Sequence, residues 1–458
     1  MTAATARLRQ PGHAGPDGML PAGVPCGEKR PYLSRGPPVR PASRCRIVSS
    51  SPDRAHDTTI CPMRISVLIP TKNRLEYLRY AVESVRRQDF PDWEVIVADN
   101  CSSDDVEGFV QTLDDDRVQY IRPDGPLPVT ANWNLAMSQS TGDYVVMLGD
   151  DDALVQGHLR SVAHLARAFS SPDVIYTGAW LFAYPGADPA WPDGYLMEYG
   201  YARFLRNRSA PYILDPASAR RLVDDFLAFR CAYGYNGQFM AFSRALIQRL
   251  LERGPVYQSP FPDYYAANAA MLASTRILAV PRPLVVIGVT PKSYGHFHHE
   301  KRESDGVAFL GQEEDEEEVR QLADVVLPGT NINTSWLFAA ERLRSRFADV
   351  PHLRSHHRRY RNLQILRSYI DATTDGTGAG DLTALRAGLS HWERIATRVL
   401  LDGLAAPTPL LRTERARVLT GLQTLHRQFL RWDPPREVGR YRTIMEAVCD
   451  IEGAGDRP

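Results

Sequence analysis

The sequence predicts an α/β fold from residue 63 to about residue 300, with a mostly parallel sheet flanked by helices. Nearly continuous apolar runs of strand length, at 65–69 and 94–98, are typical of strands buried on both faces. Between these two runs, apolar residues recur at helical spacing: Leu75, Leu78, Val82 and Val85. Strands that alternate with helices imply parallel pairing with right-handed crossovers.

The same alternation continues along the chain. We expect a weaker strand at 117–121, a helix near 130–139 and a fourth strand at 144–148. Further strands are predicted at 174–176 and 284–289. Because parallel strands end at one edge of their sheet, the residues that follow these strands are expected to lie close together.

Three regions are predicted. Residues 1–62 are rich in Pro, Arg, Gly and Ser and read as a disordered extension, unless Met63 is the true start of the protein. Residues 63–300 form the α/β domain. Residues 301–458 carry helical periodicity, many Arg and Leu and few strand signals, which predicts a helical C-terminal region.

The composition excludes several classes of protein. The 54 Lys and Arg residues balance the 54 Asp and Glu residues, so no strongly basic domain for nucleic acid emerges. The six cysteines form no C-x-x-C pair, which argues against a zinc knuckle or a disulfide framework. No apolar run is long enough for a transmembrane segment, and the N-terminus lacks the apolar core of a signal peptide. We therefore expect a cytoplasmic protein.

Three adjacent carboxylates, Asp150, Asp151 and Asp152, directly follow the apolar run 144–149. Like charges repel one another, so a fold that gathers them needs a compensating partner. Oxygen ligands of this kind suit Mg²⁺ or Mn²⁺, and such a cation would bind the two phosphates of a nucleoside diphosphate. The alternative is a solvated acidic turn after a strand.

Three motifs in this order resemble the inverting family 2 glycosyltransferases. They are SVLIPTKNR at 66–74, VADNCSSD at 97–104 and GDYVVMLGDDD at 142–152. The resemblance implies the GT-A fold, a Rossmann-like arrangement of the nucleotide-diphospho-sugar transferases. It also implies metal-dependent hexosyl transfer from a nucleotide-sugar donor to a hydroxyl acceptor, with UDP or dTDP donors favoured over guanine ones.

The resemblance places the donor against the loop that carries Pro70, Thr71, Asn73 and Arg74, with Thr71 and Arg74 beside the base and ribose. The alternative for Arg74 is an exposed arginine at the start of a helix.

The end of the second strand is assigned to the nucleotide base by the same resemblance. Asp99 would accept the imide N–H of uracil or thymine, and its alternative is a helix N-cap. Asp104 is a cap or a nucleotide contact. Asn134 would hold the donor loop, although a helix packed through Trp133 explains it as well. Relatives often carry an arginine in that region.

The acidic run matches the family's D-x-D element. Asp151 would be the main metal ligand, Asp150 would reach the ribose or a metal-bound water, and Asp152 would support them. The alignment of the acidic run with the D-x-D element can shift by one residue, because many relatives carry Asp at the position of Gly149. His298 would complete the metal shell, unless its segment is a plain surface loop.

Inverting transfer needs a general base opposite the leaving nucleotide. Asp263 is our candidate, because it follows a Pro-rich approach and precedes an Ala-rich helix, where relatives place this carboxylate. Its alternative is the N-cap of that helix. Asp224 and Asp225 are weaker rivals, since they lie within a helical pattern. The segment 231–238 mixes aromatics, amides and glycines and is either part of the acceptor site or a turn.

The alternatives are another class of enzyme on a similar sheet and a non-enzymatic scaffold. A nucleotidyltransferase or a Rossmann dehydrogenase needs a glycine-rich loop after the first strand, and 70–74 contains no glycine. A degenerate GT-A domain that serves as a scaffold would have no reason to keep three clustered charges. The acceptor stays open between a polysaccharide intermediate, a lipid-linked glycan and a small metabolite. The tail could hold an acceptor, join a homo-oligomer or, through its arginines at 354–361, touch the inner face of the membrane.

Overall fold

The computed structural model describes residues 63–187, 193–199, 202–258, 261–293, 316–329, 331–375, 379–400 and 436–455. The predicted extension at 1–62 lies outside these residues. So does His298, the histidine predicted to complete the metal shell.

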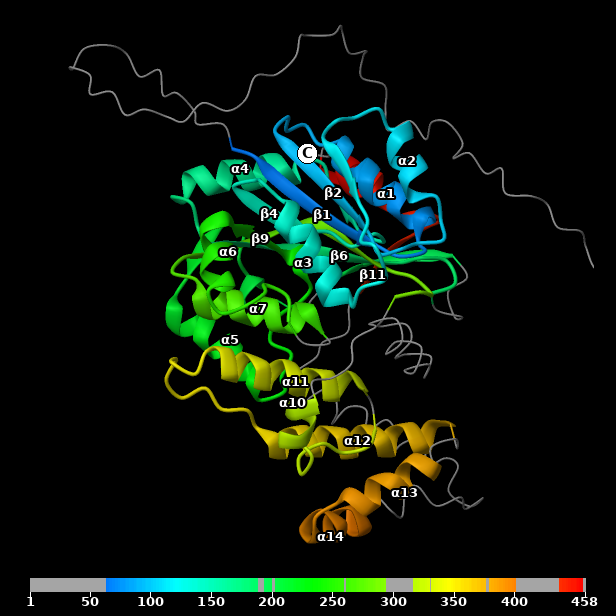
Figure 1. Ribbon diagram of the computed structural model, residues 1–458, viewed down its shortest axis with the longest axis vertical. Helices are drawn as coiled ribbons and strands as arrows, with labels where there is room; N and C mark the ends of the chain where they lie inside the picture. Colours follow the sequence, from blue (N-terminus) through cyan, green and yellow to red (C-terminus); the bar gives the residue numbers. More distant parts are fainter. Residues whose placement is uncertain are drawn as a thin grey trace, which may run out of the picture. The chain divides into compact units, whose positions relative to one another are not determined.

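The first half of the sheet consists of parallel strands joined by helices (Figure 1). In chain order the elements are β1 (Ile65–Thr71), α1 (Leu75–Arg86), β2 (Trp93–Asp99), α2 (Val106–Thr112), β3 (Val118–Ile121), α3 (Val129–Gln139) and β4 (Tyr144–Met147). β1 lies between β4 and β2, and β3 follows β2. Every residue of β1 and β2 is buried, which explains their unbroken apolar runs.

The second half makes the sheet mixed. Its elements are β5 (Ala153–Leu154), α4 (His158–Ala168), β6 (Val174–Ala183), β7 (Gly194–Glu198), η1 (Arg203–Leu205), β8 (Tyr212–Leu214), α5 (Pro216–Leu227), η2 (Gly237–Phe239), β9 (Met240–Ser243), α6 (Arg244–Leu251), α7 (Pro262–Ala273) and β10 (Ile277–Val289). β9 lies between β4 and β6 and is antiparallel to both, whereas β10 runs parallel to β6. The predicted α/β class with flanking helices is confirmed.

The C-terminal region is largely helical, as predicted. The structure contains α10 (Glu316–Gln321), α11 (Asn331–Arg346), α12 (His357–Asp375), α13 (Ala379–Gly388) and α14 (His391–Leu400). α11 packs against α7, and Trp336 of α11 donates a 3.1 Å hydrogen bond to the carbonyl of Phe226 (Figure 1). The predicted domain boundary near residue 300 stays a prediction.

One part of this region differs from a purely helical tail. Residues Arg436–Tyr441 form β11, which pairs antiparallel with β7 at the edge of the sheet. α17 (Ile444–Gly455) follows and packs against α1. Buried Ile444, Ala447 and Val448 of α17 join a cluster that contains Tyr184. The sequence between 436 and 455 is short and weakly patterned, so its pairing with a distant strand gave no local signal.

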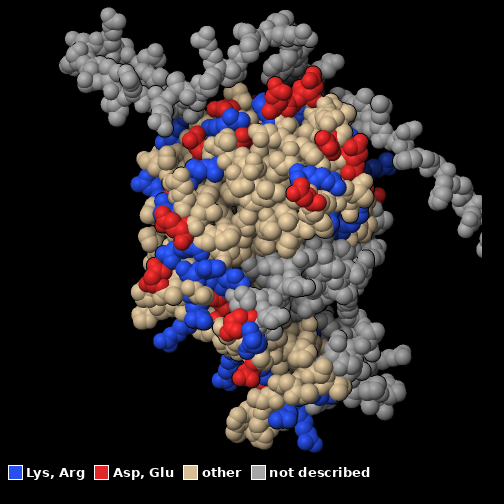
Figure 2. All heavy atoms as spheres, viewed as in Figure 1, with Lys and Arg blue, Asp and Glu red and all other residues tan. Residues whose placement is uncertain are grey.

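Charges of both signs are interspersed over the face of the molecule that Figure 2 shows, in keeping with the balanced composition. Among the residues that the structure describes, no helix combines the length and the hydropathy that crossing a bilayer requires.

Candidate active site

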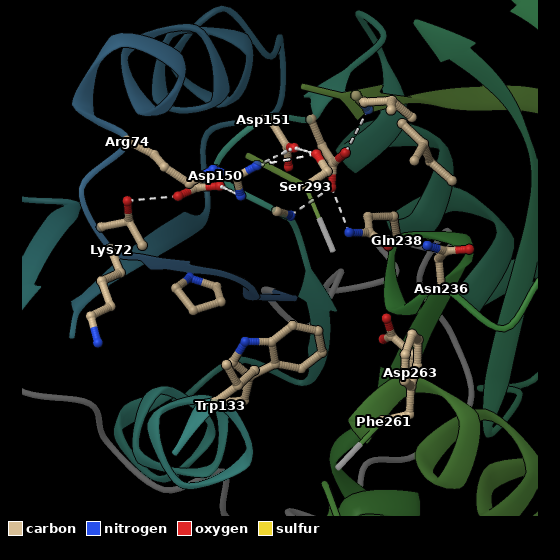
Figure 3. A pocket seen from close by; sticks show the side chains of 18 of the residues that line it. Lys72, Arg74, Trp133, Asp150, Asp151, Asn236, Gln238, Phe261, Asp263 and Ser293 are labelled. Atoms are coloured by element: carbon tan, nitrogen blue, oxygen red, sulfur yellow. Dashed lines mark hydrogen bonds and ion pairs between the residues drawn. The ribbon is translucent and has the colours of Figure 1, made fainter. Parts of the chain in front are cut away.

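A cavity of about 380 Å³ opens where β1 and β4 end (Figure 3). The loop after β1 contributes Pro70, Thr71, Lys72 and Arg74, and the loop after β4 contributes residues 149–152. α3, η2, the start of α7 and the end of β10 also contribute to its lining. The cavity therefore lies at the carboxyl edge of the parallel strands, where open α/β sheets bind ligands.

Asp152 fixes the shape of the acidic loop. Its carboxylate accepts hydrogen bonds from the backbone N–H of Gly149 at 2.7 Å and of Gly288 at 2.8 Å, and from Nε2 of Gln238 at 2.5 Å. Burial and the neighbouring carboxylate of Asp151 raise the pKa of Asp152. With its oxygens facing three donors, Asp152 holds the acidic loop in place, and its part in metal binding stays a prediction.

Arg74 is the counter-ion of the two preceding carboxylates. Its guanidinium lies 2.7 Å from Oδ1 of Asp150 through Nη1 and 2.7 Å from Oδ2 of Asp151 through Nη2. Nη2 also donates to the hydroxyl of Thr290 at 2.8 Å. Burial alone lowers the pKa of Arg74, but the carboxylates outweigh burial and raise it. The predicted alternative of an exposed arginine is wrong, because Arg74 is only 7% exposed.

Asp150 and Asp151 differ in how many of their carboxylate oxygens are hydrogen-bonded. Asp150 accepts from Thr71 Oγ1 at 2.7 Å, and burial raises its pKa against the opposing effect of Arg74. In Asp151, Oδ2 accepts from the hydroxyl of Ser293 at 2.7 Å, whereas Oδ1 makes no hydrogen bond with the described residues.

These oxygens fit a hard cation such as Mg²⁺ or Mn²⁺, because buried carboxylates with raised pKa gain from an added positive charge. Within the described residues, however, no three or more His, Cys, Asp or Glu side chains are arranged as a complete set of ligands for a metal ion. A bound cation would therefore take much of its coordination from the ligand's phosphates and from water, as Mg²⁺ commonly does.

Asp263 lies across the cavity from the acidic loop (Figure 3). Its Oδ1 accepts a 2.9 Å hydrogen bond from the backbone N–H of Gly237. Burial raises the pKa of Asp263 to about 7, although this hydrogen bond works against the shift. The alternative of a helix cap is wrong, because Phe261 is the N-cap residue of α7 and no side chain caps that helix.

Residues 66–225 match glycosyl transferase family 2. This part of the chain belongs to that family. The match covers both ends of the motif set predicted from the sequence, from the strand before Pro70 to the acidic loop.

Two curated relatives are similar to this family 2 region. The GalNAc(5)-diNAcBac-PP-undecaprenol beta-1,3-glucosyltransferase of Campylobacter jejuni is 40% identical over 109 residues, which are 22% of this chain and 34% of that protein. The putative colanic acid biosynthesis glycosyl transferase WcaA of Escherichia coli is 30% identical over 135 residues, 28% of this chain and 48% of that protein. The chain thus spans between a third and a half of these relatives.

A solved structure, residues 1–349 of Staphylococcus aureus TarS in complex with UDP-GlcNAc, also aligns. Its TM-score is 0.42 at 15% sequence identity, over 80% of this chain and 91% of that one.

Two predicted donor residues of the family 2 domain join its loops together instead of lining the cavity. Oδ1 of Asn73, which has a φ of 56°, accepts from the backbone N–H of Ser103 at 2.7 Å. Asp104 accepts from the backbone N–H of Leu75 at 3.0 Å and so caps α1. These bonds hold the loop after β1 against the loop after β2.

Asp99 is buried behind the cavity in this domain. It accepts from the backbone N–H of Ser102 and from the hydroxyl of Tyr120, both at 2.9 Å, and it pairs with Arg122. The alternative of a helix cap is wrong for Asp99, because Asp105 caps α2. Contact between Asp99 and a base stays a prediction.

Asn134 pins the segment that precedes α7. Its amide exchanges hydrogen bonds of 2.8 and 3.1 Å with the backbone of Tyr257. Trp133 packs edge-on against Tyr257 and lines the cavity. This packing agrees with the alternative of a helix that is held in place through Trp133. The rival bases Asp224 and Asp225 lie outside the cavity and pair with arginines.

Several residues of the site were not predicted from the sequence. Gln238 and Asn132 line the cavity, are more than nine-tenths buried and each carry a side-chain oxygen without a hydrogen-bond partner in the described structure. Gly288, near the end of β10, and Ser293, four residues beyond that end, contact the acidic loop. Only the mix of amides and glycines at 231–238 hinted at one of these residues.

Proposed function

We propose that this protein transfers a hexosyl group from a nucleoside diphosphate donor, UDP-linked or dTDP-linked, to a hydroxyl group with inversion. The observation that carries the proposal is the opposition of Asp263 and the acidic loop across one cavity (Figure 3). The family 2 match of residues 66–225 and the names of the curated relatives support the class of reaction.

The donor side is the acidic loop. Asp151, with its open Oδ1, and Asp150 would hold Mg²⁺ or Mn²⁺, which supplies positive charge for the leaving diphosphate. Thr71 and Arg74 keep Asp150 in place, and Asp152 fixes the loop through backbone groups from two other segments. This support prepares the site before the donor arrives.

The acceptor side is Asp263. Its carboxylate removes the proton of the acceptor hydroxyl while that oxygen attacks the sugar carbon and the bond to the diphosphate breaks. A pKa of about 7 suits a base that works near neutral pH. Among the carboxylates that line the cavity, the other three belong to the acidic loop. One displacement with one base inverts the configuration of the sugar carbon.

The proposed acceptor is a carbohydrate, either free or carried on a lipid diphosphate or a polyol phosphate. Trp133, Phe261 and Tyr264 line the cavity, and aromatic rings of this kind stack on sugar rings. One curated relative is named for an undecaprenol-linked glycan and another for poly(ribitol-phosphate).

A cytoplasmic enzyme that meets its acceptor at the inner face of the membrane fits this proposal, and a homo-oligomer through the helical region is compatible with it.

Calorimetric titration of the full chain with UDP, dTDP and GDP, each with and without Mn²⁺, tests the proposal. Binding of one nucleotide only with metal supports it and defines the donor base. Absence of binding for every nucleotide overturns it and favours a non-catalytic scaffold.

A further inference from the structure

The charges that line the cavity do not suit an anionic ligand. Its described lining contains four carboxylates, from Asp150, Asp151, Asp152 and Asp263, but only two cationic side chains, from Lys72 and Arg74. A nucleoside diphosphate brings more negative charge into this space. The proposed cation supplies part of the positive charge that its phosphates need, and a cationic side chain that the protein has not already neutralised would supply more.

Arg74 cannot supply that charge while it keeps its present partners. Nη1 and Nη2 lie 2.7 Å from Asp150 and Asp151, and Nη2 also contacts the hydroxyl of Thr290. The side chain is 9% exposed. Moving Arg74 toward a phosphate would leave two buried carboxylates without their counter-ion, which is costly.

Lys72 differs from Arg74 in each of these respects. The described structure contains no hydrogen bond or ion pair of its ammonium, and the side chain is only partly buried. Its backbone N–H helps to hold Asp150, so the residue belongs to the same loop. Figure 3 shows the ammonium turned away from Asp150 and Asp151. By contrast, Lys292 lies nearby and pairs with Glu76 at 3.1 Å.

We propose that the ammonium of Lys72 binds the diphosphate of the nucleotide donor. The inference rests on the proposed function and adds a specific phosphate contact to it. A lysine is a compact charge on a flexible stem, so Lys72 can follow the phosphates without disturbing the fork between Arg74 and the acidic loop. The contact would be to phosphate alone, so it contributes to affinity for UDP and nothing to affinity for uridine.

Calorimetry with UDP and with uridine, in the presence of Mn²⁺, tests this assignment on the full-length protein. Lys72→Met is expected to weaken UDP binding about tenfold, the size of one charge-assisted hydrogen bond. Uridine binding should stay unchanged. Lys72→Arg should keep most of the UDP affinity, and raising the salt concentration should weaken UDP binding less in Lys72→Met than in the natural protein.

Lys292→Met is the matched control, because it removes a lysine of the same region that does not line the cavity. It should bind UDP like the natural protein. Unchanged UDP binding in Lys72→Met overturns the inference, and so does an equal loss for UDP and uridine, which would mean that Lys72 shapes the loop. If the natural protein binds no nucleotide, the proposed function itself fails.

Discussion

The backbone N–H of Gly237 donates a 2.9 Å hydrogen bond to the carboxylate of Asp263. The next residue, Gln238, donates from its side chain to Asp152 of the acidic loop. The short helix η2 thus connects both sides of the cavity within two consecutive residues. A change in one side is therefore expected to reach the other.

Asp263→Asn should abolish sugar transfer and leave donor binding intact. An amide of the same shape can still accept from Gly237 but cannot take the proton of the acceptor hydroxyl. The expected loss in kcat is about 10²- to 10⁴-fold. Steady-state kinetics together with calorimetric donor titration measure the two effects, and normal turnover would exclude Asp263 as the base.

The reaction should depend on pH through the same residue. Since burial raises the pKa of Asp263 to about 7, kcat/KM should rise with pH and level off above about pH 7. A rate that stays flat between pH 5.5 and 8.5 would contradict this assignment.

Asp263 should also affect stability. In the unfolded chain its pKa returns to about 4, so the folded protein binds the proton more tightly and loses stability as pH rises from about 4 to 7. Asp263→Asn should therefore raise Tm at pH 8, and the gain should shrink toward pH 4. A gain of the same size at both pH values would indicate another cause.

Asp151→Ala should abolish metal-dependent nucleotide binding. Asp151 is the carboxylate with an oxygen that no described residue occupies, and the proposed cation would bind there. Titration of UDP with and without Mn²⁺ should then give equally weak binding. Asp224→Ala, which removes a half-exposed carboxylate of α5, is the control and should behave like the natural protein. Retained metal dependence in Asp151→Ala would refute the role of this carboxylate.

Arg74→Met should destabilise the fold by about 3–5 kcal/mol, because it leaves Asp150 and Asp151 buried without their counter-ion. Urea denaturation measures the free energy of unfolding. Arg220→Met, which breaks an exposed pair with Asp224, should cost no more than about 1 kcal/mol. Similar losses for the two variants would show that the fork at Arg74 is not a buried ion pair in solution.

Gly288→Ala should displace the acidic loop. A Cβ at position 288 would overlap the backbone carbonyl of Asp151, and backbone cannot move aside as a flexible side chain can. We expect transfer to fall roughly a hundredfold, since small displacements at a reacting centre cost that much. Gly125→Ala, where a Cβ meets open space, is the control. An active Gly288→Ala enzyme would mean that the loop tolerates the shift.

The local patterns of the sequence predicted the strands around β1 and the acidic loop, because buried parallel strands and clustered carboxylates are visible within a few residues. They also led to Asp263. They did not predict that Arg74 would neutralise the loop or that Gly288 would press against it, since these contacts join residues 77 and 136 positions apart. The mixed sheet escaped prediction for the same reason: β9 is a short strand whose place between β4 and β6 depends on partners far along the chain.

The pairing of β11 with β7 has a consequence for how the protein is made. During synthesis, β7 leaves the ribosome long before residues 436–455 do, so the nascent chain carries an unpaired strand edge for much of its translation. The cluster that includes Tyr184 is likewise incomplete until α17 has been translated. The hydroxyl of Tyr184 donates a 3.2 Å hydrogen bond to the backbone carbonyl of Asp151. We therefore expect Tyr184 to gain its final packing, and the acidic loop its full support, only after residues 444–455 have been translated.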